Sequence, residues 1–169
     1  SMPFKEACIA LVDELDASAE AIQSINTIVN TNGHLKAYNT DYIAIAQLLE
    51  THQVPKDSTF ALRGSGGMAK AVASALRDGG YKNGLIVARN ERAGRALAES
   101  LGYSWQAELG DQRPQMLINV TPIGMTGGPE ADHLAFEPEA IAAAEAVLVV
   151  VAIPSETALI VRGRAEGKR

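Results

Sequence analysis

Residues 59–71 read Thr59-Phe60-Ala61-Leu62-Arg63-Gly64-Ser65-Gly66-Gly67-Met68-Ala69-Lys70-Ala71. A short apolar run leads into a glycine cluster, which opens into an alanine-rich amphipathic segment. This order predicts a strand, a tight turn and the first turns of a helix. Glycine permits the positive φ that a tight turn needs, and the bare N–H groups at a helix N-terminus attract phosphate. The stretch therefore predicts a nucleotide-binding turn, although glycine turns also join strands to helices where no ligand binds.

A second buried strand is expected at Leu85-Ile86-Val87-Ala88, and it ends in Arg89-Asn90-Glu91-Arg92. In dinucleotide-binding folds this strand end faces the adenosine ribose. An acidic residue there accepts from the 2′-hydroxyl of NAD, whereas an arginine accommodates the 2′-phosphate of NADP. Arg89 holds this position and pairs well with phosphate, so the pattern predicts NADP. Arg92 is a second candidate, with a solvated place at a helix start as the alternative interpretation.

Composition narrows the classes of protein that the chain fits. Its 169 residues suit one domain, or one domain with part of another, and a hydrophobic content of 47% suffices for a core. A net charge of −5 argues against a nucleic-acid surface. One cysteine, Cys8, and three histidines show no metal-ligand spacing. Without an apolar run long enough to span a membrane, and without a signal peptide, a cytoplasmic protein is expected.

The sequence pattern changes at Val54-Pro55-Lys56-Asp57. Before this break we expect a helix over residues 4–15, a strand over 24–29, a hairpin through Asn32-Gly33 into 35–38, and a helix over 41–49. After it, apolar strands at 85–88, 116–120 and 146–151 follow the first one and alternate with helices. Residues 126–133 are expected to form a mobile flap. The alternation predicts an α/β fold, a Rossmann-type doubly wound parallel sheet covered on both faces.

Further motifs lie on either side of the glycine turn. Ser1-Met2-Pro3-Phe4-Lys5, Ile25-Asn26-Thr27 and Asn39-Thr40-Asp41 precede it, and Asn119-Val120-Thr121-Pro122-Ile123-Gly124-Met125 follows Arg89. In this order and approximate spacing, the motifs resemble those of the shikimate dehydrogenase family, and specifically of its divergent shikimate dehydrogenase-like branch. Each motif alone is weak evidence for the family, and the resemblance rests on all of them occurring in this order.

The resemblance implies a role for each motif. Lys5 and Asp41 would be catalytic, and Asn26 and Asn39 would bind substrate. The implied cofactor-binding residues are Gly64, Ser65, Gly66, Gly67, Met68, Ala69, Arg89, Arg92, Asn119, Thr121 and Pro122, with NADP as cofactor and no metal. A lysine ammonium can stabilise and protonate the oxygen that becomes negative as hydride arrives, and a neighbouring carboxylate would orient it. From the residues alone, Lys5 also fits a solvated lysine, Asp41 a helix N-cap, and the two asparagines turn residues.

The resemblance covers the middle of the family's sequence. It implies the end of a substrate-binding α/β domain and a linker helix over residues 1–57, an NADP-binding Rossmann domain over 58–153, and the start of a returning C-terminal helix over 154–169. Val149 and Ala152 stand where the family carries an aspartate and a tyrosine, and the missing tyrosine favours a related hydroxy acid over shikimate, or a slow enzyme. Incompletely covered apolar faces predict self-association or an unstable N-terminal portion.

Three functions remain open at this point. The first is an NADP-dependent oxidoreductase that interconverts a ring ketone and a secondary alcohol of a shikimate- or quinate-like hydroxy acid. The second is an NADP-binding module, or truncated pseudoenzyme, without turnover. The third is another enzyme on the same fold, such as a glutamyl-tRNA reductase relative, against which the absence of a suitably placed nucleophilic cysteine and of a basic RNA-binding face both count. The expected partner is a small-molecule hydroxy acid, not nucleic acid or membrane.

Overall fold

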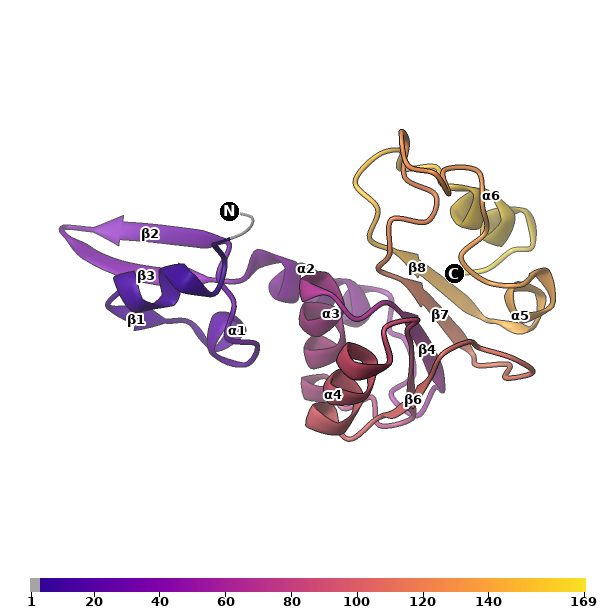
Figure 1. Ribbon diagram of the computed structural model, residues 1–169, viewed down its shortest axis with the longest axis horizontal. Coiled ribbons are helices and arrows are strands. Elements are labelled where there is room, and N and C mark those ends of the chain that lie inside the picture. Colours follow the sequence, from indigo (N-terminus) through magenta and orange to yellow (C-terminus); the bar gives the residue numbers. More distant parts are fainter. Residues whose placement is uncertain (1–3) are drawn as a thin grey trace. The chain divides into compact units, whose positions relative to one another are not determined.

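The computed structural model describes residues 4–169, so the Ser1-Met2-Pro3 part of the predicted lysine motif lies outside the described residues (Figure 1). The chain divides into two compact units. The first runs to Val54 and includes Lys70–Gly80, and the second comprises Pro55–Ala69 and Tyr81–Arg169. The domain limits expected from the sequence, 1–57, 58–153 and 154–169, stay predictions.

The first unit contains a three-stranded sheet with the order β1-β3-β2. Strands β2 (Thr27–Thr31) and β3 (His34–Tyr38) form an antiparallel hairpin, and β1 (Glu14–Leu15) pairs with β3 in parallel. The hairpin turns through Asn32 and Gly33, whose φ angles of +53° and +94° are those that a two-residue turn matched to strand twist needs. The predicted hairpin is confirmed, with β2 placed about three residues later than expected.

The helix expected over residues 4–15 is wrong. This segment forms a short 3₁₀ helix, η1 (Ala7–Leu11), and then extends into β1. Asp13 explains the change, because its N–H donates to the Leu35 carbonyl at 2.9 Å and its carboxylate accepts from the Leu35 N–H at 2.7 Å. These bonds to β3 outweigh the local helical spacing, a case of tertiary contacts overriding propensity. The apolar side chains still meet in a small core, which comprises Cys8, Ile9, Val12, Leu15, Ala19, Ile25 and Ala37.

Besides η1, three α-helices in the described residues contribute to the first unit. Helix α1 (Ala17–Glu20) is capped by Asp16, whose carboxylate accepts from the Ser18 N–H. Helix α2 (Thr40–Thr51) confirms the predicted helix and extends it at both ends. Helix α3 (Gly67–Asp78) begins at the glycine turn, and its residues from Lys70 onward belong to the first unit.

The second unit is built on a five-stranded sheet with the order β6-β5-β4-β7-β8, in which every pair is parallel. Its strands are β4 (Phe60–Arg63), β5 (Gly84–Val87), β6 (Ser104–Gln106), β7 (Met116–Asn119) and β8 (Ala146–Val149). The predicted Rossmann-type parallel sheet is confirmed. Strand β6 was not expected, because its Ser-Trp-Gln sequence lacks an apolar run and it lies at the edge of the sheet.

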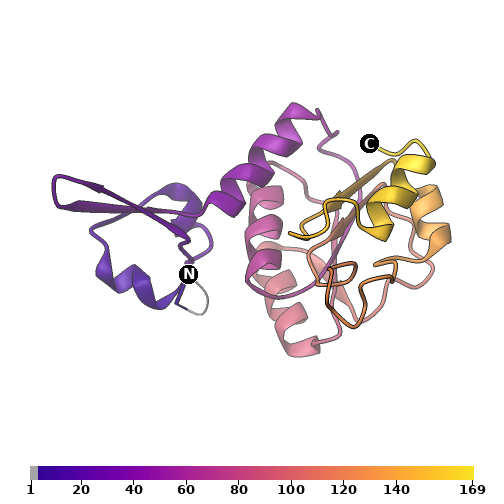
Figure 2. The ribbon, with the colours of Figure 1, turned by 90° about the horizontal axis from the view of Figure 1, so that it is seen from above.

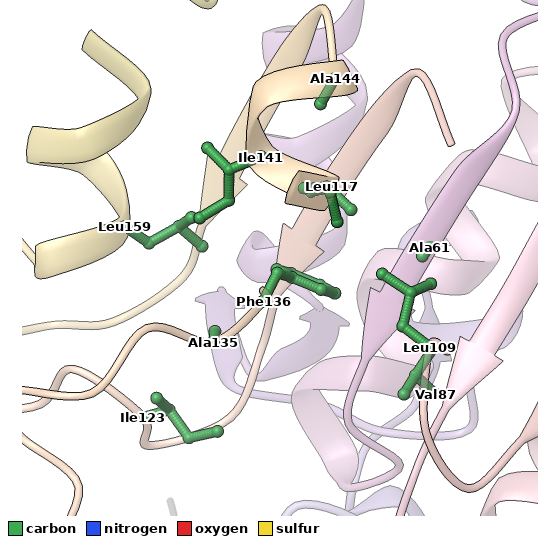
Figure 3. Packing of buried hydrophobic residues seen from close by; sticks show 11 residues of the cluster. Ala61, Val87, Leu109, Leu117, Ile123, Ala135, Phe136, Ile141, Ala144 and Leu159 are labelled. Carbon is green, nitrogen blue, oxygen red and sulfur yellow. The ribbon is translucent and has the colours of Figure 1, made fainter. Parts of the chain in front are cut away.

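Helices cover both faces of this sheet. Helix α4 (Glu91–Leu101) packs against β5 and β6, while α5 (Pro138–Ala143) and α6 (Ala158–Ala165) lie on the opposite face (Figures 1 and 2). Gly94 allows the close approach of α4, since a Cβ there would lie 2.3 Å from the Trp105 Nε1. On the other face, Ala61, Leu117, Phe136, Ile141 and Leu159 belong to one buried apolar cluster (Figure 3).

The described part of the chain offers no helix with both the length and the apolar character to cross a membrane. Within residues 4–169, no three His, Cys, Asp or Glu side chains gather as they would around a metal ion.

Candidate functional site

Lys5 and Asp41 meet in the first unit. The Lys5 Nζ lies 3.3 Å from the Asp41 Oδ2, and each side chain is 28% exposed. The Lys5 carbonyl accepts from the Ile25 N–H at 2.9 Å, which fixes the lysine backbone beside the segment that carries Asn26. Asp41 stands in the first turn of α2, where the helix dipole favours a negative charge. The geometry therefore presents a half-exposed ammonium with one carboxylate to orient it.

Asn26 lies against the start of the same helix. Its Oδ1 accepts from the Thr40 N–H at 2.9 Å and from the Thr40 hydroxyl at 3.1 Å. Among residues 4–169, the Asn26 Nδ2 has no hydrogen-bond partner. Because Asn26 is only half-buried, this amide remains a donor for a ligand oxygen.

Asn39 is the N-cap of α2. Its Oδ1 accepts from the Tyr42 N–H at 3.1 Å, its Nδ2 donates to the Ser24 carbonyl at 3.0 Å, and the residue is buried. The sequence alternatives for this motif included an N-cap, and the structure puts that cap at Asn39 rather than at Asp41. Asn39 thus holds the start of α2, which carries Asp41, and its predicted contact with substrate stays a prediction.

The glycine turn between β4 and α3 lies in the second unit. Gly64 has a φ of +133°, and a Cβ there would lie 2.7 Å from the Val120 Cγ2. Gly66 and Gly67 differ, because a Cβ at either would have no neighbour within 4 Å. The protein itself therefore requires glycine at Gly64, whereas the bare surface over Gly66 and Gly67 leaves room for a ligand at the start of α3. A diphosphate fits this place, since the first N–H groups of a helix have no partner within the helix.

The other predicted residues of this turn differ in exposure. Ser65 and Met68 are half-buried, while Ala69 is fully buried and contributes its side chain to the protein interior.

The predicted arginines follow β5. Arg89 stands two residues beyond the strand end and its side chain is 72% exposed. Its Nη2 lies 3.6 Å from the Oε2 of Glu130. Arg92 is exposed in the first turn of α4 and makes no ion pair with any residue in 4–169. Both guanidiniums are therefore accessible to an anion from solvent.

Asn119 and Thr121 shape the loop after β7. The buried Asn119 accepts at Oδ1 from the Thr121 N–H and hydroxyl, at 3.0 and 2.6 Å, and donates from Nδ2 to the Ile123 carbonyl at 3.0 Å. Its polar atoms are thus engaged by its own loop. Pro122, at the tip, is exposed. We conclude that Asn119 positions the loop, while direct cofactor contacts from Thr121 and Pro122 stay predictions.

Residues 126–133 form a succession of turns. Backbone bonds hold them, including Thr126 N–H to the Ile153 carbonyl at 2.9 Å and Gly124 N–H to the Glu130 carbonyl at 2.9 Å. The predicted mobility of this flap stays a prediction.

Sequence reasoning missed two charged residues of the second unit, Arg63 next to the glycine turn and Glu130 opposite Arg89. Arg63 ends β4, is 16% exposed, and lies over the Phe136 ring at 5.3 Å with its Nη2 3.5 Å from Glu108. Its buried Nε has no hydrogen-bond partner within residues 4–169. Its sequence position gave only a weak signal, because a strand-end arginine is usually solvated and its burial depends on tertiary contacts. No sequence pattern pointed to Glu130, because the residue it faces, Arg89, lies 41 positions earlier in the chain.

These features define a class of protein: a Rossmann-type α/β protein with a glycine turn open to a phosphate and a separate lysine–aspartate pair. No protein-family model matches the chain. A curated relative, the shikimate dehydrogenase-like protein of Haemophilus influenzae, is 48% identical over 169 residues, which are 100% of this chain and 62% of the relative. The chain thus spans less than two thirds of that relative's length.

Two solved structures also match this chain over its whole length. A structure of a shikimate 5-dehydrogenase-like protein matches 100% of this chain and 63% of its own, with a TM-score of 0.98 and 48% identity. Shikimate 5-dehydrogenase from Thermus thermophilus, in complex with NADP(H) and shikimate, matches 100% of this chain and 63% of its own, with a TM-score of 0.84 and 26% identity. Over its whole length the chain is therefore similar to proteins of the shikimate dehydrogenase family, shikimate dehydrogenase-like proteins among them.

Proposed function

We propose that this chain carries the cofactor-binding turn and the lysine–aspartate pair of an NADP-dependent oxidoreductase. The reaction interconverts a ring ketone and a secondary alcohol of a shikimate- or quinate-like hydroxy acid. The observation that carries the proposal is the contact of 3.3 Å between the Lys5 Nζ and the Asp41 Oδ2. It supports a catalytic interpretation because both side chains are partly exposed, and because Asn26, next to the Ile25 that bonds to the Lys5 carbonyl, has an amide donor without a partner in residues 4–169.

The residues of the first unit suit proton transfer. During reduction a hydride adds to the carbonyl carbon, and negative charge develops on the carbonyl oxygen. The Lys5 ammonium stabilises this charge and donates a proton to the oxygen, which yields the alcohol and leaves a neutral amine that takes a proton from water. Asp41 keeps the Lys5 Nζ in place, and the Asn26 Nδ2 donates to a substrate hydroxyl. In the reverse direction Lys5 accepts the proton of the alcohol.

The second unit suits NADP, which supplies or accepts the hydride when bound. The N–H groups at Gly66 and Gly67 would hold its diphosphate, and Arg89 would pair with its 2′-phosphate. Two observations support this fit: the empty space that a Cβ would fill at both glycines, and the accessible guanidinium of Arg89. The relative from Thermus thermophilus in complex with NADP(H) and shikimate supports the same cofactor and the same class of substrate.

The test combines binding and turnover on the purified chain. Calorimetry measures the affinity for NADP⁺, and the absorbance of the reduced cofactor follows turnover with shikimate or quinate. Binding together with turnover supports the oxidoreductase. Binding without turnover leaves the second candidate, an NADP-binding module, and absence of binding to either pyridine nucleotide refutes both.

The lysine variant separates the two parts of the proposal. Lys5→Ala is expected to abolish turnover and to leave the NADP⁺ affinity nearly unchanged, because the contacts proposed for NADP come from the glycine turn and Arg89 and not from Lys5. The exposed Lys56 provides a control of equal charge change, and Lys56→Ala should retain turnover. A Lys5→Ala variant that keeps full turnover would remove Lys5 from the mechanism. A cytoplasmic location and a small-molecule partner belong to the same proposal, and self-association stays a prediction.

A further inference from the structure

The guanidinium assigned to the 2′-phosphate faces a carboxylate of its own chain. The Arg89 Nη2 lies 3.6 Å from the Glu130 Oε2, close enough for an ion pair but beyond hydrogen-bond distance. Arg89 is 72% exposed and Glu130 is 33% exposed. The contact therefore leaves the remaining Arg89 donors open, and it places a negative charge where a phosphate would approach.

Glu130 is held at this place by its backbone. Its carbonyl accepts from the Gly124 N–H at 2.9 Å and from the His133 N–H at 3.2 Å. Gly124 has a φ of +88°, a left-handed backbone conformation that glycine adopts without steric cost. The carboxylate thus belongs to a defined loop that follows β7, not to the strand end where sequence reasoning looked for an acid.

The two charges have opposite effects on the two pyridine nucleotides. A 2′-phosphate would be attracted by the Arg89 guanidinium. It would, however, compete with Glu130 for that guanidinium, and the Glu130 carboxylate would repel it. A 2′-hydroxyl has no charge to repel, and a carboxylate is the group that accepts from it in NAD sites.

We propose that Glu130 is a specificity-determining residue that competes with the 2′-phosphate for Arg89, so that the site binds NADP less tightly than Arg89 alone would allow and retains affinity for NAD. The inference rests on the proposed function, because it concerns the cofactor of that same site. It assigns the discrimination between NADP and NAD to two residues on different loops, Arg89 after β5 and Glu130 after β7.

Calorimetric titration of the chain with NADP⁺ and with NAD⁺ tests this assignment. Glu130→Gln keeps the size of the side chain and removes its charge. It should tighten NADP⁺ binding about three- to fivefold, the upper part of the range for an exposed ion pair, and leave NAD⁺ binding unchanged or weaker. The exposed Glu99→Gln in α4 changes the net charge equally and should alter neither affinity.

The double variant shows whether Glu130 acts through Arg89. In an Arg89→Ala background, Glu130→Gln should lose its selective effect on NADP⁺. Equal tightening of both nucleotides, unchanged or weakened NADP⁺ binding, or a full effect without Arg89 would each overturn the inference. These outcomes differ from failure of the proposed function, in which the parent chain binds neither nucleotide.

Discussion

Gly64 and Gly66 lie in the same turn, but the space around their α-carbons differs. An alanine at Gly64 meets a φ of +133° and the Val120 side chain at 2.7 Å, whereas an alanine at Gly66 meets nothing within 4 Å. We expect Gly64→Ala to lower the free energy of unfolding by about 2–4 kcal/mol, from the left-handed backbone together with the overlap. Urea denaturation measures this loss.

Gly66→Ala is the matched control, and it should change the free energy of unfolding by less than about 1 kcal/mol. Its effect should appear in cofactor affinity instead, because a methyl group enters the space assigned to the diphosphate. Loss of the fold in Gly66→Ala, or undiminished NADP⁺ binding by it, would contradict this division of roles.

Arg89 supplies the residue-scale test of cofactor choice. Arg89→Ala should weaken NADP⁺ binding by about tenfold or more, because a charge-assisted hydrogen bond contributes about 1.5–3 kcal/mol. NAD⁺ has no 2′-phosphate and should lose far less. Calorimetry on both nucleotides makes the comparison, with the exposed Lys82→Ala as a control of equal charge change. Equal losses for NADP⁺ and NAD⁺ would refute the 2′-phosphate role.

The residues that the motifs singled out fall into two groups: those that lie together as expected, and those whose side chains hold their own loops. Lys5 and Asp41 lie together as the motif order suggested, and the Gly64–Gly67 turn opens a helix. The side-chain amides of Asn39 and Asn119 are instead hydrogen-bonded within the protein. Their Nδ2 groups donate to the Ser24 and Ile123 carbonyls, and their Oδ1 atoms accept from neighbouring residues of their own turns. A sequence shows which residue types are present but not which partners use their hydrogen-bonding groups, so such positioning roles could not be predicted.

At the scale of elements, prediction succeeded where apolar runs were long and local. Strands β4, β5, β7 and β8 are such runs, and each was expected. The failures are short elements that depend on a neighbour. Strand β1 forms through bonds to β3, and β6 is an edge strand completed by its pairing with β5. Neither carries a pattern that a window of sequence can detect.

The link between α2 and α3 gives a prediction about pH. The Tyr42 hydroxyl donates to the Asp78 Oδ2 at 2.7 Å. Burial, followed by this hydrogen bond and the negative charge of Asp78, raises the pKa of Tyr42 from 10.0 to about 12. Because the folded-state pKa lies above the unfolded value, the contribution of Tyr42 to stability is complete below pH 10 and is lost as the pH rises toward 12.

A spectrophotometric titration of tyrosinate absorbance checks this shift. The difference between the parent chain and Tyr42→Phe should show one group ionising near pH 12, and the variant should have lost part of its free energy of unfolding at pH 8. A difference curve centred near pH 10, the value of an unperturbed tyrosine, would show that the Tyr42–Asp78 bond does not form in solution.

At the scale of the whole molecule, the candidate residues are divided between the two units. The lysine–aspartate pair and both asparagines belong to the first unit, and all eleven predicted cofactor residues belong to the second, since 58–69 and 81–169 lie there. The order of the motifs suggested two groups on either side of residues 54–57, and the expected domain limits stay predictions. The sequence could not predict that α3 is divided between the two units. Tertiary contacts assign its residues from Lys70 onward to the first unit.

The place of the candidate cofactor residues in the second unit predicts which backbone amides NADP⁺ should protect from hydrogen exchange. A ligand that binds only the folded state at a hundred times its dissociation constant stabilises that state by about 2.7 kcal/mol. Hydrogen exchange with NADP⁺ should therefore slow at residues 64–69 and 89–92, where the backbone and the guanidinium would contact the nucleotide. In the Arg89→Ala variant, protection at 89–92 should fall more than protection at 64–69, because the diphosphate contacts remain. Exchange that stays unchanged at the glycine turn at saturating NADP⁺ would mean that the open surface over Gly66 and Gly67 does not hold the diphosphate.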